Sequence, residues 1–195
     1  IEIHEWRQVG DHFEEKYVSD VIFSTNLSFI PVDLKLDPRG ALYICDWYNP
    51  IKGHMQYSLR DERRDRSSGR IWRVVPKGAK LPAAPTIAGA SVASLLELLK
   101  SAPYRHRDLA KRELADRGRA AVEPALAEWV RALDRKDPRF RHHQIEALWT
   151  TRAIGAVNGA LFREAIACEE PMARAAATRQ LRYWHEHFPD ALEML

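Results

Sequence analysis

The first part of the chain alternates apolar and polar residues with the two-residue period of β-strands. Clear alternation runs over residues 1–6 and again over residues 32–36, where the turn residues 37–40 follow directly. A further apolar run begins at Ala41, so a hairpin is expected around this turn. The pattern predicts antiparallel strands over residues 1–6, 18–23, 32–36, 41–45 and 69–75.

The hydrophobic period changes near residue 85. Residues 76–90 are rich in proline, glycine and alanine and are expected to form a linker. From Ser91 onward apolar residues recur at i, i+3, i+4 and i+7, which is the spacing of one face of an α-helix. The same spacing returns in residues 122–133 and 177–188. Residues 91–195 are therefore predicted to be helical.

The helical part also repeats. Three prolines stand where helices would start, and an arginine follows each of them: the pairs are Pro103 and Arg107, Pro138 and Arg141, and Pro171 and Arg174. Each proline is expected at the first position of a helix, with Asp137 as the N-cap of the second one. Paired helices that recur in this way are typical of solenoids. The repeated arginine favours HEAT-like repeats, and we expect it to join neighbouring repeats by pairing with an acidic residue or a helix C-terminus.

The predicted fold class is α+β with more than one domain. Residues 1–75 are interpreted as the last blade region of a partial β-propeller, because a few short antiparallel strands in this order make one blade. Residues 76–90 form the linker, and residues 91–195 form an all-α, HEAT-like solenoid.

Charge and composition narrow the classes of function. The formal net charge is +3, and both signs alternate in residues 60–66. This alternation favours internal ion pairs over a track for phosphates, so no nucleic-acid partner is expected. No apolar run is long enough to span a bilayer. The two cysteines, Cys45 and Cys168, form neither a disulfide framework nor a zinc site, and the CxxCH haem-attachment motif is absent. The first residue is Ile rather than Met, which fits a mature or excised fragment.

A long ordered series of short motifs lies between about Gly10 and Val75. They cover residues 29–34, 37–43, 46–50, 53–56, 60–61, 64–66 and 69–74. The series resembles the last propeller blade of large exported proteins from planctomycetes and related bacteria, the membrane-bound dehydrogenases or PVC-type haem-binding proteins. Ile30 departs from this pattern, in which an arginine is expected.

The resemblance implies a propeller like those of quinoprotein glucose and sorbosone dehydrogenases, followed by HEAT repeats and a small c-type cytochrome. It implies an oxidoreductase in which a sugar or alcohol is oxidised and electrons pass to haem c in a domain outside this chain. Pyrroloquinoline quinone (PQQ) and Ca²⁺ are implied for the longer protein, with no cofactor in this fragment. The partners would be the remaining blades and the cytochrome domain, and the location would be periplasmic or exported.

Two hypotheses of function follow. In the first, the chain is a fragment of a quinoprotein-like dehydrogenase, in which the helices act as a spacer. The fragment alone cannot close a propeller ring, so it is expected to be inactive. In the alternative, the chain is a non-catalytic module that binds a protein or a polysaccharide. Resemblance of fold does not decide between them, because propellers host many functions.

Candidate site residues follow the strand over 41–45, where a propeller directs its loops toward the central funnel. Asp46 and Asn49 could bind a substrate hydroxyl or Ca²⁺. Asp and Asn after a strand also form Asx turns, and we favour this structural interpretation. Trp47 and Tyr48 could stack on a sugar ring or pack between blades.

The candidate catalytic residue is His54, because histidine titrates near neutral pH and can accept a proton during hydride abstraction. It could equally orient its loop through one hydrogen bond. Arg60 and Arg64 could bind a carboxylate or sulfate through their guanidinium groups. A loop closed by salt bridges is the alternative that we favour for these arginines.

No metal site is expected. The neighbouring histidines at positions 142 and 143, and those at 185 and 187, point to different faces of a helix, whereas helical zinc pairs need i, i+4 spacing.

Overall fold

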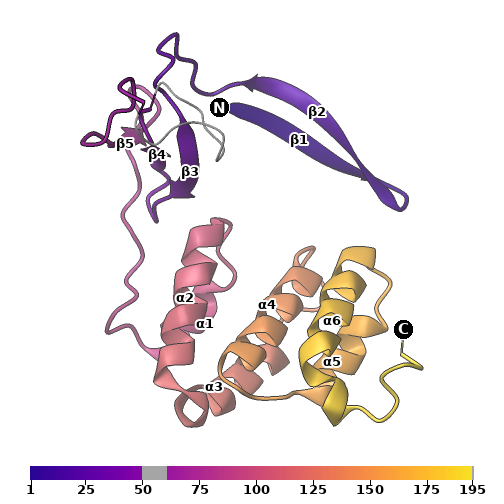
Figure 1. Ribbon diagram of the computed structural model, residues 1–195. Coiled ribbons are helices and arrows are strands. Elements are labelled where there is room, and N and C mark those ends of the chain that lie inside the picture. Colours follow the sequence, from indigo (N-terminus) through magenta and orange to yellow (C-terminus); the bar gives the residue numbers. More distant parts are fainter. Residues whose placement is uncertain (50–60, 195) are drawn as a thin grey trace. The chain divides into compact units, whose positions relative to one another are not determined.

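The computed structural model describes residues 1–49 and 61–194. This part of the chain contains two small antiparallel sheets followed by six α-helices, so the α+β prediction is confirmed (Figure 1). The chain divides into two units, residues 1–82 and 83–195. The strands are β1 (Glu2–Val9), β2 (His12–Asp20), β3 (Pro31–Leu36), β4 (Leu42–Asp46) and β5 (Arg70–Val74). The helices are α1 (Val92–Leu98), α2 (Tyr104–Arg117), α3 (Arg119–Arg131), α4 (Phe140–Ala153), α5 (Gly159–Ile166) and α6 (Pro171–Trp184), and α6 leads into a short 3-10 helix, η1 (His185–His187).

β1 and β2 form a hairpin with the two-residue turn Gly10-Asp11. Val9 pairs with His12 across this turn, and Gly10 has a φ of 61°, where glycine is favoured. The bounds predicted for the second strand, residues 18–23, are wrong, because β2 begins at His12 and ends at Asp20. The sequence signal for the true position is the Gly-Asp pair, which suits a tight hairpin turn.

β3, β4 and β5 form the second sheet, with β4 in the centre. Leu34, Ile44 and Trp72 stand opposite one another on the three strands and therefore share one face. Ile44 is fully buried, whereas Leu34 and Trp72 are each 43% exposed. The hairpin predicted around residues 37–40 is confirmed, because β3 and β4 pair on either side of it.

The six helices pack in two layers. α2, α4 and α6 lie side by side with α4 in the middle, and α1, α3 and α5 pack behind them (Figure 1). The amphipathic stripe predicted from the sequence explains this arrangement, since α3 buries Val122, Leu126 and Trp129 at helical spacing. The shared core also contains the buried side chains of Leu96, Leu114, Leu148, Phe162, Leu181 and Trp184.

The prolines of the repeat do not all start a helix. Pro171 is the first residue of α6, as predicted, but Pro103 is the N-cap of α2. The N-cap of α4 is Arg139 rather than Asp137. Asp137 closes the preceding turn instead, where its Oδ1 accepts the backbone N–H of Arg139 at 2.7 Å and its carbonyl accepts that of Phe140 at 2.8 Å. α4 therefore begins at Phe140, and Pro138 is not its first residue.

Within the described residues, none of the helices combines the length and the apolar character that a membrane crossing requires.

Candidate functional site

Asp46, at the end of β4, is the centre of the site predicted from the sequence. Its side chain is buried, and its Oδ1 accepts the backbone N–H groups of Ile30 at 2.8 Å and Tyr48 at 3.0 Å. The indole Nε1 of Trp72 donates to Oδ2 at 2.9 Å. Asp46 thus joins β4 to β5 and to the residue before β3. The bond to Tyr48 is the Asx turn that the sequence suggested.

These contacts also set the charge of Asp46. Burial by itself would raise the pKa of this carboxyl, but the hydrogen bonds from Trp72, Ile30 and Tyr48, together with the charge of Arg70, hold the pKa below its ordinary value of 3.8. Asp46 is therefore ionised at neutral pH, with its negative charge directed toward internal donors.

The aromatic residues after Asp46 differ in their surroundings. Tyr48 has a φ of 52°, and the guanidinium carbon of Arg70 lies 3.3 Å from the centroid of its ring. Trp47 is 49% exposed, and its backbone N–H donates to the carbonyl of Ile30 at 2.9 Å. Asn49 is buried. Stacking on Arg70 gives Tyr48 a structural partner, while the ring of Trp47 stays accessible.

His54 and Arg60 lie outside the described residues. Arg64 is described, and its backbone N–H donates to the carbonyl of Asp61 at 3.1 Å. The adjacent Arg63 binds the Asp61 carboxylate, which lowers the pKa of Asp61 to about 2. These contacts join close neighbours in the sequence, and the role of the Arg64 side chain stays a prediction.

In the helical unit, Arg107 on α2 has the partners predicted for the repeated arginine. Its guanidinium donates to the carbonyls of Ser101 at 2.6 Å and Ala102 at 2.7 Å, just after α1. Its Nε donates to Glu146 Oε1 on α4 at 2.8 Å, and Lys111 Nζ lies 2.5 Å from Oε2 of the same carboxylate. Glu146 is 2% exposed, so this buried carboxylate joins α2 to α4.

Arg174 repeats the first of these contacts on α6. It donates to the carbonyls of Cys168 at 2.9 Å and Glu169 at 2.8 Å, after the end of α5. Arg141 on α4 lies 3.2 Å from Glu164 on α5. The prediction that these arginines join neighbouring helices is confirmed.

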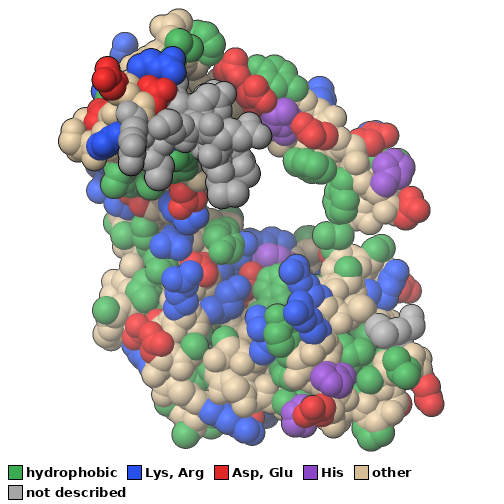
Figure 2. All heavy atoms as spheres, viewed as in Figure 1, with side chains coloured by type: hydrophobic (Ala, Val, Ile, Leu, Met, Phe, Trp, Pro, Cys, Tyr) green, Lys and Arg blue, Asp and Glu red, His purple; other side chains and the backbone are tan. Residues whose placement is uncertain are grey.

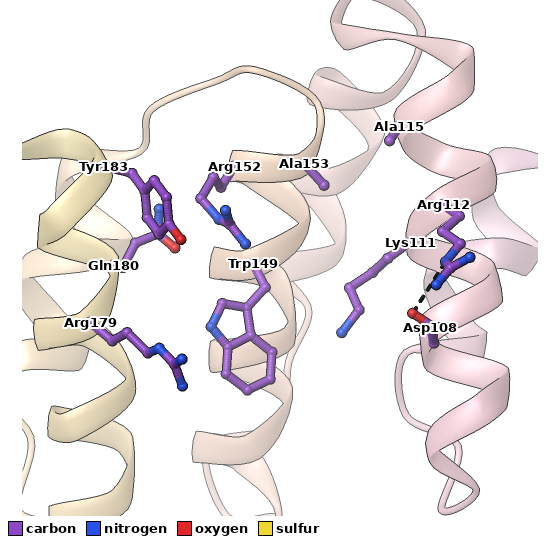
Figure 3. Close-up of a pocket in the computed structure, with 10 residues that line it drawn as sticks. All are labelled: Asp108, Lys111, Arg112, Ala115, Trp149, Arg152, Ala153, Arg179, Gln180 and Tyr183. Atoms are coloured by element: carbon purple, nitrogen blue, oxygen red, sulfur yellow. Dashed lines mark ion pairs between the residues drawn. The ribbon is translucent and has the colours of Figure 1, made fainter. Parts of the chain in front are cut away.

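A groove of about 430 Å³ crosses the face formed by α2, α4 and α6 (Figure 3). Each helix contributes residues at the spacing of one helical face. We call this the basic groove, and it is lined by Asp108, Lys111, Arg112 and Ala115 of α2, Trp149, Arg152 and Ala153 of α4, and Arg179, Gln180 and Tyr183 of α6.

The basic groove contains more cations than carboxylates. Arg112 lies 3.4 Å from Asp108, the one acidic residue of the lining. Among the described residues, no carboxylate lies within ion-pair distance of Arg152 or Arg179. Figure 2 shows Lys and Arg side chains gathered around hydrophobic ones over α4 and α6. Arg152 and Arg179 therefore give the groove positive charge that no carboxylate of the described residues neutralises.

Aromatic rings hold some of these cations in place. The guanidinium carbon of Arg152 lies 4.3 Å from the ring centroid of Tyr183, and Lys111 Nζ lies 5.0 Å from that of Trp149. Figure 3 shows Trp149 between Lys111 and Arg179. These ring contacts orient the cations. The charge of Lys111 is balanced by Glu146, whereas that of Arg152 has no carboxylate partner among the described residues.

Gln180 adds an unused hydrogen-bond donor to the groove. Its side chain is only 2% exposed, and its Nε2 has no hydrogen-bond partner among the described residues. Buried amide nitrogens nearly always have an acceptor, and leaving one unpaired costs free energy. An acceptor group of a ligand would complete this site.

A second hollow of about 430 Å³ lies beside the basic groove, between α4 and the first part of α6. The two share Trp149 and Arg179. We call it the apolar pocket, and its remaining lining is Arg141, His142, Ile145, Glu170, Met172, Ala173, Ala175 and Ala176. Burial lowers the pKa of His142, so this imidazole is neutral at pH 7.

No group of three or more His, Cys, Asp or Glu side chains in residues 1–49 and 61–194 is placed to hold a metal ion.

None of the residues of the basic groove is predicted as a site residue from the sequence. A signal is present in two segments that combine arginine with an aromatic residue and contain no acidic residue. They are Trp149-Thr150-Thr151-Arg152 and Arg179-Gln180-Leu181-Arg182-Tyr183. Only the packing of α4 against α6 shows that the two segments share one face.

Comparison with known proteins adds one match. Residues 4–78, which are less than half of the chain, match the family model of a domain of unknown function, DUF7133. No curated protein and no solved structure matches the chain.

Proposed function

We propose that the helical unit is a HEAT-like solenoid that acts as a non-catalytic binding module for an anionic partner. The observation that carries this proposal is the basic groove, where Arg152 and Arg179 have no carboxylate partner within the described residues. Arginines that are left unneutralised beside aromatic rings are suited to bind carboxylate, sulfate or phosphate groups.

The packing of the helices supports the solenoid interpretation. Three successive helix pairs, α1 with α2, α3 with α4 and α5 with α6, stack so that the second helices form one continuous face. Arg107 and Arg174 bind the carbonyls that follow the preceding helix in the same way. Arg107 belongs to the first helix pair and Arg174 to the third, so the same contact recurs in the repeat. A face made of equivalent helices is the usual binding surface of such repeats.

The test is salt-dependent retention of the full 195-residue chain on immobilised polyglutamate and heparin. Retention is expected at low salt and should decrease as salt is raised, because screening weakens exposed charge interactions. The double variant Arg152→Glu/Arg179→Glu should elute at clearly lower salt. Arg131→Glu/Lys136→Glu is the matched control, because it makes the same change of charge on α3 and just after it, outside the basic groove. Equal retention of the groove variant and the control would refute the proposal.

For the first unit, we propose that the sheet β3–β4–β5 is a propeller blade whose faces are covered by other blades of a longer protein. The exposed apolar side chains support this proposal, because a blade buries both of its faces. Val32 is 59% exposed, Leu36 56% and Ile71 72%. In a longer protein that contains the preceding blades, those blades should cover these residues. Such a protein is therefore expected to bind less of the dye ANS, counted per β3–β4–β5 sheet, than this chain does. Equal dye binding would count against the blade.

The resemblance to planctomycete-type dehydrogenases suggests a second function for that longer protein, the oxidation of a sugar or alcohol in the periplasm. Asp46 does not fit a Ca²⁺ site, because its carboxylate is buried and accepts internal donors. Any PQQ and Ca²⁺ would therefore need other residues. Dye-linked sugar oxidation by the longer protein supplied with PQQ and Ca²⁺ tests this proposal, and the absence of PQQ-dependent turnover would reject it.

A further inference from the structure

Resting on the binding function proposed above, we propose that the partner is an extended acidic peptide segment of another protein, with a bulky apolar side chain next to its carboxylates. The basic groove would bind the carboxylates, and the apolar pocket would bind the apolar side chain. The two hollows differ in composition and share Trp149 and Arg179, so one ligand can occupy both.

The apolar pocket identifies the class of partner. Its walls include the side chains of Ile145, Met172 and Ala176, and Met172 is 53% exposed. Exposed methionine beside small apolar residues gives an adaptable surface for an apolar side chain. A polysaccharide has no such group, and its hydroxyls would lose water against Ile145, Met172 and Ala176 without gaining hydrogen bonds there. The pocket therefore favours a peptide over a sugar polymer.

The charged residues around the apolar pocket restrict its occupant further. Glu170 lies in the lining, and burial keeps the neighbouring His142 neutral at pH 7. A carboxylate of the peptide would be repelled by Glu170, whereas Arg179 at the shared wall attracts it toward the basic groove. The apolar side chain and the carboxylates are thus directed to different hollows.

The geometry of the helices sets the spacing of the carboxylates. Neighbouring packed helices lie about 8–10 Å apart. An extended chain in the polyproline II conformation advances about 3.1 Å for each residue and turns every third side chain to the same face. A peptide that crosses α6, α4 and α2 therefore passes one helix about every three residues. Carboxylates at this spacing would meet Arg179 and Arg152 in turn, whereas Lys111 on α2 is already paired with Glu146. Gln180, whose Nε2 lacks an acceptor, could donate to a backbone carbonyl of the peptide.

The experiment measures fluorescence anisotropy of a labelled peptide with the full chain at low salt. The peptide carries aspartate at every third position and leucines between them, and a matched peptide has serine in place of each leucine. Heparin serves as an unlabelled competitor. We expect the leucine peptide to bind about tenfold more tightly than the serine peptide, because a buried leucine side chain gives at least this factor.

Two variants separate the contributions of the two hollows. Arg152→Glu/Arg179→Glu should weaken both peptides by about tenfold or more. Met172→Ser/Ala176→Gln should remove most of the preference for leucine and leave the serine peptide nearly unchanged. Arg131→Glu/Lys136→Glu is the control for charge, and circular dichroism checks that each variant is folded.

The outcomes distinguish this inference from the function on which it rests. If both peptides bind equally, or if heparin binds at the groove and the peptides do not, the acidic peptide with an apolar side chain is wrong while the anionic binding module stands. If no probe responds to the groove variants, both proposals fail.

Discussion

Arg174 and Arg179 lie on the same helix, but only Arg174 has hydrogen-bond partners in the described structure. Arg174 binds two carbonyls beyond the end of α5, whereas Arg179 faces the basic groove with no carboxylate near it. The same side chain thus serves the fold at one position and is free for a ligand at the other. The difference follows from the helix end that happens to lie beside Arg174.

The two arginines should therefore differ in their effect on stability. Arg174→Met is expected to lower the free energy of unfolding of the helical unit by about 1–2 kcal/mol, because two carbonyls lose a charged donor. Arg179→Met should change it by less than about 0.5 kcal/mol. Urea unfolding followed by circular dichroism at 222 nm measures both values. Similar losses for the two variants would contradict the assigned roles.

His143 gives the helical unit a predictable dependence on pH. Its side chain is buried, and burial lowers its pKa below 6.5 despite the opposing charge of Asp137. The unfolded chain then binds a proton more readily than the folded one, so stability is greatest above pH 6.5 and falls as the pH is lowered toward the folded-state pKa. His143→Gln should reduce the loss of stability as the pH falls below 6.5, and part of the loss should remain because burial also lowers the pKa of His142. Thermal unfolding at a series of pH values measures this change. An unchanged slope would show that His143 does not cause it.

At the scale of elements, the buried carboxylate of Glu146 determines how α2 and α4 are joined. It binds Arg107 and Lys111, which are 13% and 18% exposed in their side chains. Because both cations are largely shielded from water, neither would be fully hydrated if the charge of Glu146 were removed. Each of the three charged groups is therefore stabilised by the others. Lys111 is also part of the basic groove, and Glu146 therefore fixes the position of one of its charges.

Replacing Glu146 should be costly for this reason. Glu146→Gln is expected to destabilise the helical unit by about 3 kcal/mol or more, because two half-buried cations lose their counter-charge. Glu123→Gln removes an exposed ion pair with Arg119 and should cost less than about 0.5 kcal/mol. Chemical denaturation of the two variants side by side provides the comparison, and equal effects would refute the buried network.

At the scale of the whole molecule, the two units differ in how well they cover their apolar side chains. The core cluster of the helical unit runs from Leu95 to Phe188 and lies wholly within that unit. The strands leave several large apolar side chains exposed, including Trp6, Phe13 and Tyr17 in the β1–β2 hairpin. A two-stranded hairpin is marginal by itself, so the helical unit is the more independent of the two.

Residues 83–195 alone should therefore fold. A chain of these residues is expected to keep its helical circular dichroism spectrum and to unfold cooperatively, with a Tm within about 5 °C of that of the helical unit in the full chain. Loss of cooperativity, or a much lower Tm, would show that residues 1–82 are needed for its stability.

The sequence by itself determined the order of strands and helices, because the apolar period of two residues in 1–6, 32–36 and 69–75 gives way to helical spacing after Ser91. It also determined the role of the repeated arginines, since Arg107 and Arg174 occupy equivalent places in the repeat. Both are local or periodic properties that can be read along one segment. The start of α4 was missed because Asp137 can cap either a turn or a helix, and local residues alone do not choose between them.

Only the tertiary structure decided where the candidate binding surface lies. Lys111, Trp149, Arg152, Arg179 and Gln180 are spread over three helices, and no spacing along the chain shows that they share one groove. Their neighbourhood depends on which faces of α2, α4 and α6 are turned away from the core. That choice is made by the packing of buried side chains across both layers, which involves residues far apart in the sequence.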